Sequence, residues 1–311
     1  MSDTAGNKEF GIGILCAGLS YILWGFLPLF WKLVDDVPAG EILAHRIVWS
    51  LVFMLLILVV IRKVPTFTFE LKALVTNRKR FFAISLASIF ISINWGLYIW
   101  AVNADRVIEA SLGYYINPLV SILLAVIVLK EKLSGLQTLS IILAGVGVLV
   151  LTISYGTFPW VAIMLAVSFA FYGLIKKMVQ VGALVGLAIE TLLITPFALI
   201  FLTYVHRSAD GAGAFGESFG LTALLMFAGV VTAIPLLLFA TGAKRIPLSM
   251  VGLLQYFAPT IKLILGVYLF NEPFTNAHLI AFTCIWSALA IYTLSLRKWR
   301  RRDGSLASVK G

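Results

Sequence analysis

Charged residues are scarce in this chain, and that scarcity limits what the protein can be. Only 12% of its 311 residues are Asp, Glu, Lys or Arg, and 61% are hydrophobic. Soluble domains carry about 25% charged residues, so this composition excludes a single water-soluble core. Apolar runs of about 20 residues, long enough to cross a hydrocarbon layer of about 30 Å as helices, recur along the whole sequence. The sequence therefore predicts an all-α integral membrane protein.

Residues that typically carry catalysis or hold metals are also rare. Neither the phosphate-binding pattern G-x-x-x-x-G-K-[ST] nor the nucleophile pattern G-x-S-x-G occurs. The three histidines are isolated, and the two cysteines, Cys16 and Cys284, fall in apolar runs where cysteine usually acts as a small hydrophobic residue. We therefore expect no metal, no cofactor and no enzymatic activity.

Ten membrane spans account for most of the chain. The predicted spans are residues 11–31, 41–61, 81–102, 109–129, 136–153, 158–175, 184–204, 219–240, 248–270 and 277–296. The first run is followed by "WKLVDD" and not by a small-residue cleavage site, so it is expected to remain as a span. The longest connection, Arg62 to Arg80, has room for at most a short surface helix. Any function is expected to lie within the helix bundle.

The positive charges are distributed unevenly between the two sides of the predicted spans. Of the 24 Lys and Arg residues, 19 fall in the tails and in the connections on the side of the termini, and 3 fall in the opposite connections. Arg46 and Lys262 lie within spans. By the positive-inside rule both termini are expected in the cytoplasm. The basic C-terminal stretch is explained in the same way, so nucleic acid is not an expected partner, whereas the lipid bilayer is.

Two segments of the sequence resemble each other and indicate an internal repeat. They run from Ala104 to Ser134 and from Ala243 to Thr275. The match rests on four pairs: Arg106 with Arg245, Gly113 with Gly252, Pro118 with Pro259, and Glu131 with Glu272. Each repeat spans the membrane five times, and because five is odd the second repeat must enter from the opposite side. We expect two inverted five-helix repeats, residues 1–155 and 156–311, as in many secondary transporters.

The matched prolines predict a bend at equivalent places in both halves. A proline inside a helix removes one backbone hydrogen bond and clashes with the preceding turn. Kinks are therefore expected near Pro118 and Pro259, although Gly and Pro are also simply frequent in membrane helices. Paired interruptions of this kind point to a binding region.

Three stretches of the sequence resemble a known family. These are "SINWGLYIWAVNADRVIEASLGYYINPL" (Ser92–Leu119), "GEILAHRIVWS" (Gly40–Ser50) and "IPLSMVGLLQYFAPT" (Ile246–Thr260). They resemble the RarD group of EamA-type permeases in the drug/metabolite transporter superfamily, and the resemblance covers nearly the whole chain. It implies a ten-helix permease of the bacterial inner membrane that moves small organic solutes without ATP hydrolysis. Relatives in the superfamily export amino acids, other metabolites and drugs, and the RarD name is attached to chloramphenicol sensitivity.

The expected function is thus secondary transport of small metabolites or drugs, with export as the expected direction. The alternative is a membrane receptor or sensor that does not transport, although the short connections offer little surface for a partner. The sequence indicates neither the substrate, the coupling ion nor the oligomeric state.

Four ionisable residues within the predicted spans are functional candidates, because a charge at the centre of a membrane helix costs about 2.5 to 3.5 kcal/mol on insertion scales. Arg46 and Lys262 are expected in the outer half, where two cations would favour a carboxylate-bearing or amino-acid-like substrate. Glu190 is a candidate for proton coupling, and so is His45. The alternatives are snorkelling of Lys262 toward the headgroups and structural pairing of Arg46 and Glu190. Direct pairing of these two residues is unfavourable because their estimated depths differ by more than about 10 Å.

Aromatic and amide side chains within the spans are expected to complete the binding pocket. Rings offer apolar contact with a polar handle, and buried amides need partners that a substrate can supply. Many such residues are ordinary packing or interface residues in membrane proteins. The candidates are Trp24, Asn94, Trp95, Tyr98, Tyr114, Tyr115, Asn117, Tyr172, Gln255 and Tyr256.

Overall fold

A computed structural model describes residues 2–104, 106–179, 181–207, 213–269 and 274–308, and its described part consists of helices and their connections. The first half contains α1 (Ser2–Trp31), the 3-10 helix η1 (Lys32–Val34), α2 (Ala39–Val60), α3 (Val64–Thr76), α4 (Arg78–Asn103), α5 (Val107–Ile127) and α6 (Gly135–Tyr155). The second half contains α7 (Trp160–Met178), α8 (Ala183–Arg207), α9 (Phe219–Ala243), α10 (Leu248–Leu254), α11 (Phe257–Leu269) and α12 (Asn276–Ser308).

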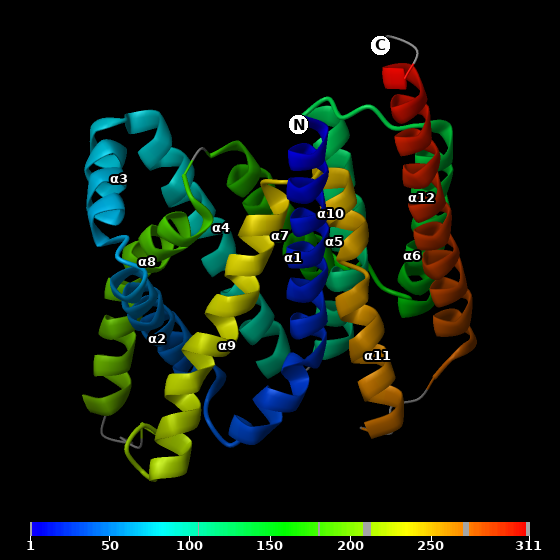
Figure 1. Ribbon diagram of the computed structural model, residues 1–311. Coiled ribbons are helices and arrows are strands. Elements are labelled where there is room, and N and C mark those ends of the chain that lie inside the picture. The colour runs from blue at the N-terminus through cyan, green and yellow to red at the C-terminus, as the bar shows by residue number, and fades with distance from the viewer. Residues whose placement is uncertain (1, 105, 180, 208–212, 270–273, 309–311) are drawn as a thin grey trace.

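Ten segments within the described ranges are long and apolar enough to cross a membrane. Each overlaps one predicted span, with ends that differ by a few residues, so the all-α membrane architecture is confirmed. The long connection after α2 contains the short helix α3, which is the most that its length was expected to allow. The N-terminus, the C-terminus and α3 lie at the same end of the bundle (Figure 1). This is the arrangement that an even number of spans requires.

The ninth span is interrupted, and the interruption lies slightly before the proline that predicts it. Helix α10 ends at Leu254 and α11 begins at Phe257. Pro259 has no N–H to donate to the carbonyl of Gln255, and the Ala258 N–H donates to that carbonyl instead, at 3.1 Å. The proline therefore lies in the first turn of α11, where a missing N–H is tolerated, and the break falls at Gln255 and Tyr256. Helix α5, by contrast, continues through Pro118 without a break.

The two halves of the chain interlock. Helix α2 packs on α8 and α9, α5 packs on α7 and α10, and α1 packs on α9 and α11. Helices α6 and α12 pair with each other at one edge of the bundle (Figure 1). The repeat glycine Gly252 lies directly on the repeat proline of the other half, because a Cβ added to it would be 2.9 Å from the Pro118 carbonyl oxygen. The partner that the repeat assigns to Glu131, Glu272, lies outside the described residues.

Candidate functional site

A cavity of about 500 Å³ lies between the two halves of the bundle. Its walls come from α1, α2, α4 and α5 of the first half and from α7, α9, α11 and the α10–α11 break of the second. Lys32 and Asp35, in the connection between α1 and α2, also line it. That connection lies at the end of the bundle opposite the termini (Figure 1), so the cavity reaches toward that end.

Most residues expected in a binding pocket do line this cavity. They are Trp24, Arg46, Asn94, Trp95, Tyr98, Tyr114, Asn117, Gln255, Pro259 and Lys262. The residues expected at a functional site that lie outside its lining are His45, Tyr115, Pro118, Tyr172, Glu190 and Tyr256.

Arg46 is held on the cavity wall by aromatic faces and one hydroxyl. Its guanidinium carbon lies 4.7 Å from the ring centre of Trp31 and 5.1 Å from that of Trp95. Its Nε donates a hydrogen bond to Thr232 Oγ1 at 2.9 Å. Cation–π contacts at such distances are attractive but leave the edge of the guanidinium plane available. Among the described residues no hydrogen bond is formed by the two terminal nitrogens, so they are available to a further acceptor.

Lys262 is placed by a ring of the facing helix. Its Nζ lies 3.6 Å from the ring centre of Tyr114 on α5. The Tyr98 ring from α4 meets the Tyr114 ring at 6.0 Å in an edge-on arrangement. Neither Lys262 nor Arg46 forms an ion pair within the described ranges of the chain. The lysine that appears isolated in the sequence is thus part of a cationic, aromatic wall.

Amide side chains join the helices around the cavity. The Gln255 amide nitrogen, at the helix break, donates to Ser121 Oγ at 3.3 Å, and this hydroxyl donates to Asn117 Oδ1 at 3.3 Å. Asn94 Nδ2 donates to the Leu165 carbonyl at 2.9 Å and to Ser168 Oγ at 3.0 Å. These bonds hold α4 to α7 and α5 to the break between α10 and α11. Ser121 lies three residues past Pro118 and Lys262 lies three residues past Pro259, so the repeat pairs these two positions as well.

Packed rings separate the cavity from the end that carries the termini. Trp24 and Phe169 line the cavity, with ring centres 5.7 Å apart. Both contact the buried ring of Phe239, at 5.8 Å and 5.4 Å. Tyr172 lies beyond them, 5.9 Å from Phe239 and fully buried. The cavity floor is therefore an aromatic layer built by α1, α7 and α9.

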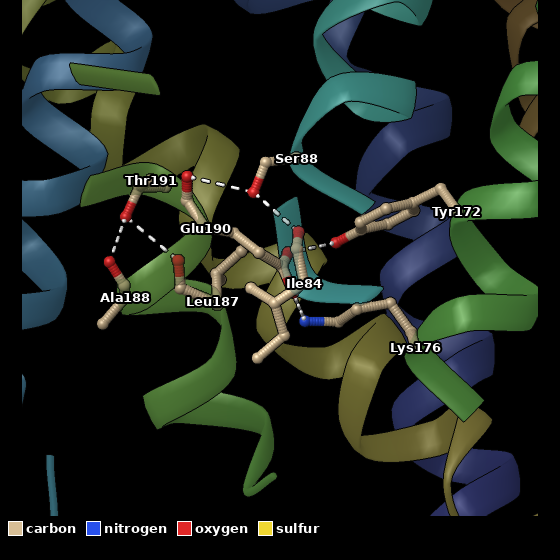
Figure 2. A network of polar contacts seen from close by, with 8 residues as sticks. All are labelled: Ile84, Ser88, Tyr172, Lys176, Leu187, Ala188, Glu190 and Thr191. Carbon is tan, nitrogen blue, oxygen red and sulfur yellow. Dashed lines mark hydrogen bonds and ion pairs between the residues drawn. The ribbon is translucent and has the colours of Figure 1, made fainter. Parts of the chain in front are cut away.

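Glu190 pairs with Lys176, a residue that the predicted spans place in a connection and not in a helix. Lys176 Nζ lies 2.7 Å from Glu190 Oε1, and the Tyr172 hydroxyl donates to Glu190 Oε2 at 3.3 Å (Figure 2). Counting Lys176 among the basic residues of a connection is wrong, because α7 extends to Met178 and buries this side chain. The spacing of the sequence offers a signal: Tyr172 and Lys176 are four residues apart and so share one face of a helix.

Ser88 extends this network to α4. Its hydroxyl lies 3.0 Å from the Ile84 carbonyl and 3.4 Å from the Glu190 carbonyl (Figure 2). A crevice of about 10 Å³, lined by Lys176, Glu190 and Lys244 among others, adjoins the pair. That is about the space needed for one water molecule.

His45 lies in a separate depression between α2 and α8. Its ring stacks on Phe215 at 4.7 Å, and its Nε2 is 3.7 Å from Glu41 Oε1. Both ring nitrogens are buried without a hydrogen-bond partner in the described structure. The depression is lined by His45, Trp49, His206, Arg207, Phe215 and three further residues. His45 and Arg46 are adjacent in sequence, but His45 lines this depression and Arg46 lines the central cavity.

Tyr115 and Tyr256 are packed in the core. The Tyr115 hydroxyl donates to the Pro259 carbonyl at 3.4 Å, and its ring meets Phe282 edge-on. Tyr256 is fully buried at the helix break. Their neighbours Tyr114 and Gln255 line the cavity instead, because adjacent residues on a helix point in different directions.

Several cavity residues are absent from the sequence interpretation. They include Tyr21, Trp31, Asp35, Phe169 and Thr232. Phe169 lies in "SFAFYG" (Ser168–Gly173), which resembles "SYILWG" (Ser20–Gly25) of the first half, and it takes there the place of Tyr21, which also lines the cavity. Thr232 gives no such signal, because threonine is common on membrane helices and bonds there to its own backbone.

The sequence of this chain is similar to those of known transporters over nearly its whole length. A family model described as the EamA-like transporter family matches residues 11–153 and again residues 159–294. The chain is 48% identical over 299 residues to the uncharacterized transporter YojE of Bacillus subtilis (strain 168), covering 96% of this chain and 99% of that protein. It is 44% identical over 298 residues to protein RarD of Streptomyces exfoliatus, covering 96% and 93%.

A solved crystal structure has the same fold. It superposes with a TM-score of 0.69 at 18% sequence identity and covers 92% of this chain and 98% of that one. The family match spans nearly the whole chain, and so do the relatives. This chain is therefore a RarD-type permease and belongs to the EamA-like transporter family.

Proposed function

We propose that this protein is a secondary transporter that moves small organic metabolites or drugs through the central cavity. The observation that carries the proposal is the cavity of about 500 Å³. Residues from both halves of the chain line it, and Lys32 and Asp35 extend its lining toward the end of the bundle opposite the termini (Figure 1). Ligand sites are typically of about 300 to 1,000 Å³ and combine apolar walls with a few polar groups. A site between two repeats is where alternating access needs it.

The proposed mechanism is alternating access between two inverted repeats, residues 1–155 and 156–311. The two separate matches to one family model support this division. With the termini in the cytoplasm, as the charge distribution predicts, the cavity faces the outside and the aromatic floor faces the cytoplasm. Transport then requires Trp24, Phe169 and Phe239 to separate. Export is the direction that the family resemblance favours.

Proton coupling is proposed at the Glu190 pair. In this conformation the carboxylate is held by Lys176 and Tyr172 beneath the aromatic floor. Protonation of Glu190 would leave the Lys176 ammonium uncompensated, which favours a rearrangement of α7 against α8. His45 is the second candidate, with Glu41 as its nearest acidic neighbour.

Reconstitution tests the function directly. Purified protein in proteoliposomes is given a panel of radiolabelled organic acids, amino acids, amines and chloramphenicol, with and without a proton gradient. We expect at least one solute to be taken up faster than by empty liposomes and to exchange with unlabelled solute on the opposite side. Exchange without added ATP is the property of a secondary transporter.

Two results would contradict the proposal. Binding of a solute without any flux or exchange would favour the receptor alternative. Absence of both binding and flux across the whole panel would remove the support that the cavity gives.

A further inference from the structure

We propose that the central cavity binds a small organic carboxylate, with its acid group between Arg46 and Lys262 and its apolar body on the aromatic walls. This inference rests on the proposed transport function and specifies its substrate class. The two cations come from α2 of the first half and α11 of the second, so one anion between them would contact both halves.

The charge balance of the cavity favours an anion. Among the residues that the structure describes, its lining contains the cations Lys32, Arg46 and Lys262 but a single carboxylate, that of Asp35. Arg46 and Lys262 are half-buried, and in the described part of the chain neither has a carboxylate partner. Buried charges in membrane proteins are usually paired, because an isolated charge in a medium of low polarity is strongly unfavourable. An anionic ligand would supply the missing partner.

The geometry at Arg46 favours a planar acid group. Two aromatic rings contact the guanidinium and the Thr232 hydroxyl accepts from Nε, so within the described ranges the two terminal nitrogens are left for a ligand. This remaining edge of the guanidinium can donate two parallel hydrogen bonds to a carboxylate. Lys262, held over Tyr114, adds a point charge from the opposite half.

The remaining lining favours an apolar ligand body. Trp24, Trp95, Tyr98 and Phe169 line the cavity from α1, α4 and α7. Aromatic side chains provide large contact areas for rings and aliphatic chains. A compact acid with a ring therefore fits both features of the site, whereas an organic cation would meet uncompensated positive charge.

A series of compounds with one shared ring tests the charge requirement. Phenylacetate, phenylacetamide and phenethylamine are titrated against the protein in nanodiscs, with tryptophan fluorescence as the signal because Trp24, Trp31 and Trp95 line the cavity. We expect phenylacetate to bind at least about 10-fold more tightly than the amide, since a charge-assisted hydrogen bond typically contributes this much or more. The amine is expected not to bind in the same range.

Single-charge variants locate the site. Arg46→Gln and Lys262→Gln should each weaken phenylacetate binding by about 10-fold or more while leaving amide binding unchanged within about 2-fold. Lys132→Gln, which removes an exposed cation outside the cavity, should change neither value. Elution volume and unfolding temperature without ligand identify any variant that fails to fold, and Arg46→Lys serves as a milder second variant.

The outcomes separate the inference from the proposed function. Equal affinity for acid and amide, or phenylacetate binding unchanged in both cavity variants, overturns the carboxylate assignment. If neutral or cationic solutes from the panel are still transported in that case, the transport function stands. If nothing in the panel is bound or moved, the transport function itself is contradicted.

Discussion

The Lys176 ammonium lies 2.7 Å from the Glu190 carboxylate, and both side chains are at most 5% exposed. The pair joins α7 to α8 directly beneath the aromatic layer that forms the cavity floor. Tyr172 belongs to both groups, because its ring stacks on Phe239 and its hydroxyl donates to Glu190. Changes at the pair are therefore expected to be transmitted to the floor of the cavity.

Removing one member of this pair should be more harmful than removing both. Glu190→Gln leaves a buried ammonium without its counter-charge, a loss that typically costs about 3 to 5 kcal/mol. Lys176→Met is the other single variant, and combining it with Glu190→Gln removes both charges, so the double variant should lose less stability than the two single variants together. The free energies of unfolding are measured by SDS titration in mixed micelles. A double variant that loses the sum of the two single losses would show that the charges are not coupled.

Transport by the Glu190→Gln variant should lose its dependence on pH if this carboxylate is the coupling group. The charged or polar groups that face it are Lys176 and Tyr172 from α7, Ser88 from α4 and Lys244 from the end of α9. Solute exchange is measured from pH 5.5 to pH 8.5 in proteoliposomes, with His45→Gln as the matched variant for the other candidate. A pH profile unchanged by Glu190→Gln but flattened by His45→Gln would transfer the role to His45.

Thr232 should matter for ligand binding although it carries no charge. Its hydroxyl accepts the Arg46 Nε–H, so Thr232→Val removes the bond that fixes the guanidinium while keeping the side-chain shape. One hydrogen bond is worth about 0.5 to 1.5 kcal/mol, which corresponds to a loss of about 2-fold to 10-fold in phenylacetate affinity. Thr191→Val is the control, because this buried hydroxyl bonds to carbonyls of its own helix. Equal affinities in both variants would leave Thr232 without a positioning role.

Gly252 is expected to tolerate no larger side chain. Gly252→Ala places a Cβ 2.9 Å from the Pro118 carbonyl oxygen and from Ile122 Cγ1, so the helices must move apart, at a cost of about 1 to 3 kcal/mol. Gly145→Ala provides a control of opposite sign, because its Cβ would meet only Leu119 Cδ1 at 4.0 Å. There the better helix propensity of Ala should stabilise by up to about 1 kcal/mol. Unfolding by SDS titration compares the two variants, and a neutral Gly252→Ala would contradict the close contact.

The spans could be predicted from the sequence because membrane helices leave a strong local signal, a run of apolar residues of fixed length. The helix break could be predicted only approximately. Pro259 marks it, but the steric clash of proline acts on the preceding turn, so the chain deviates at Gln255 and Tyr256. Local sequence thus indicates that a helix is disturbed more reliably than it indicates where.

The candidate site was less predictable because it depends on which helices meet. Arg46 and Lys262 are conspicuous as charges in apolar runs, whereas Thr232 and Trp31, which contact Arg46, are ordinary residues on other elements. The predicted span ends at residue 175, three residues before the end of α7, and so places the buried cation Lys176 in a connection. Tyr114 lines the cavity and Tyr115 packs in the core because the two rings point in different directions from the same helix. An apolar run without a polar face gives no signal of which direction faces the cavity.

Lys244 offers a prediction about stability and pH. It lies just beyond α9 and lines the crevice beside Lys176 and Glu190. Burial, followed by the nearby charge of Lys176, lowers the pKa of Lys244 from 10.5 to about 8. The unfolded chain therefore binds more protons than the folded protein between about pH 8 and pH 10.5, and stability rises with pH through this window.

Below about pH 8 both states carry the proton and the folded state bears the full cost of the buried charge. Lys244→Gln removes that cost, so the variant should be more stable than the wild type at pH 7, and the difference should shrink as the pH approaches 10. Midpoints of thermal unfolding are compared across this range in detergent, with the exposed Lys132→Gln as control. A difference between wild type and Lys244→Gln that stays constant from pH 7 to pH 10 would show that this lysine does not titrate in the window.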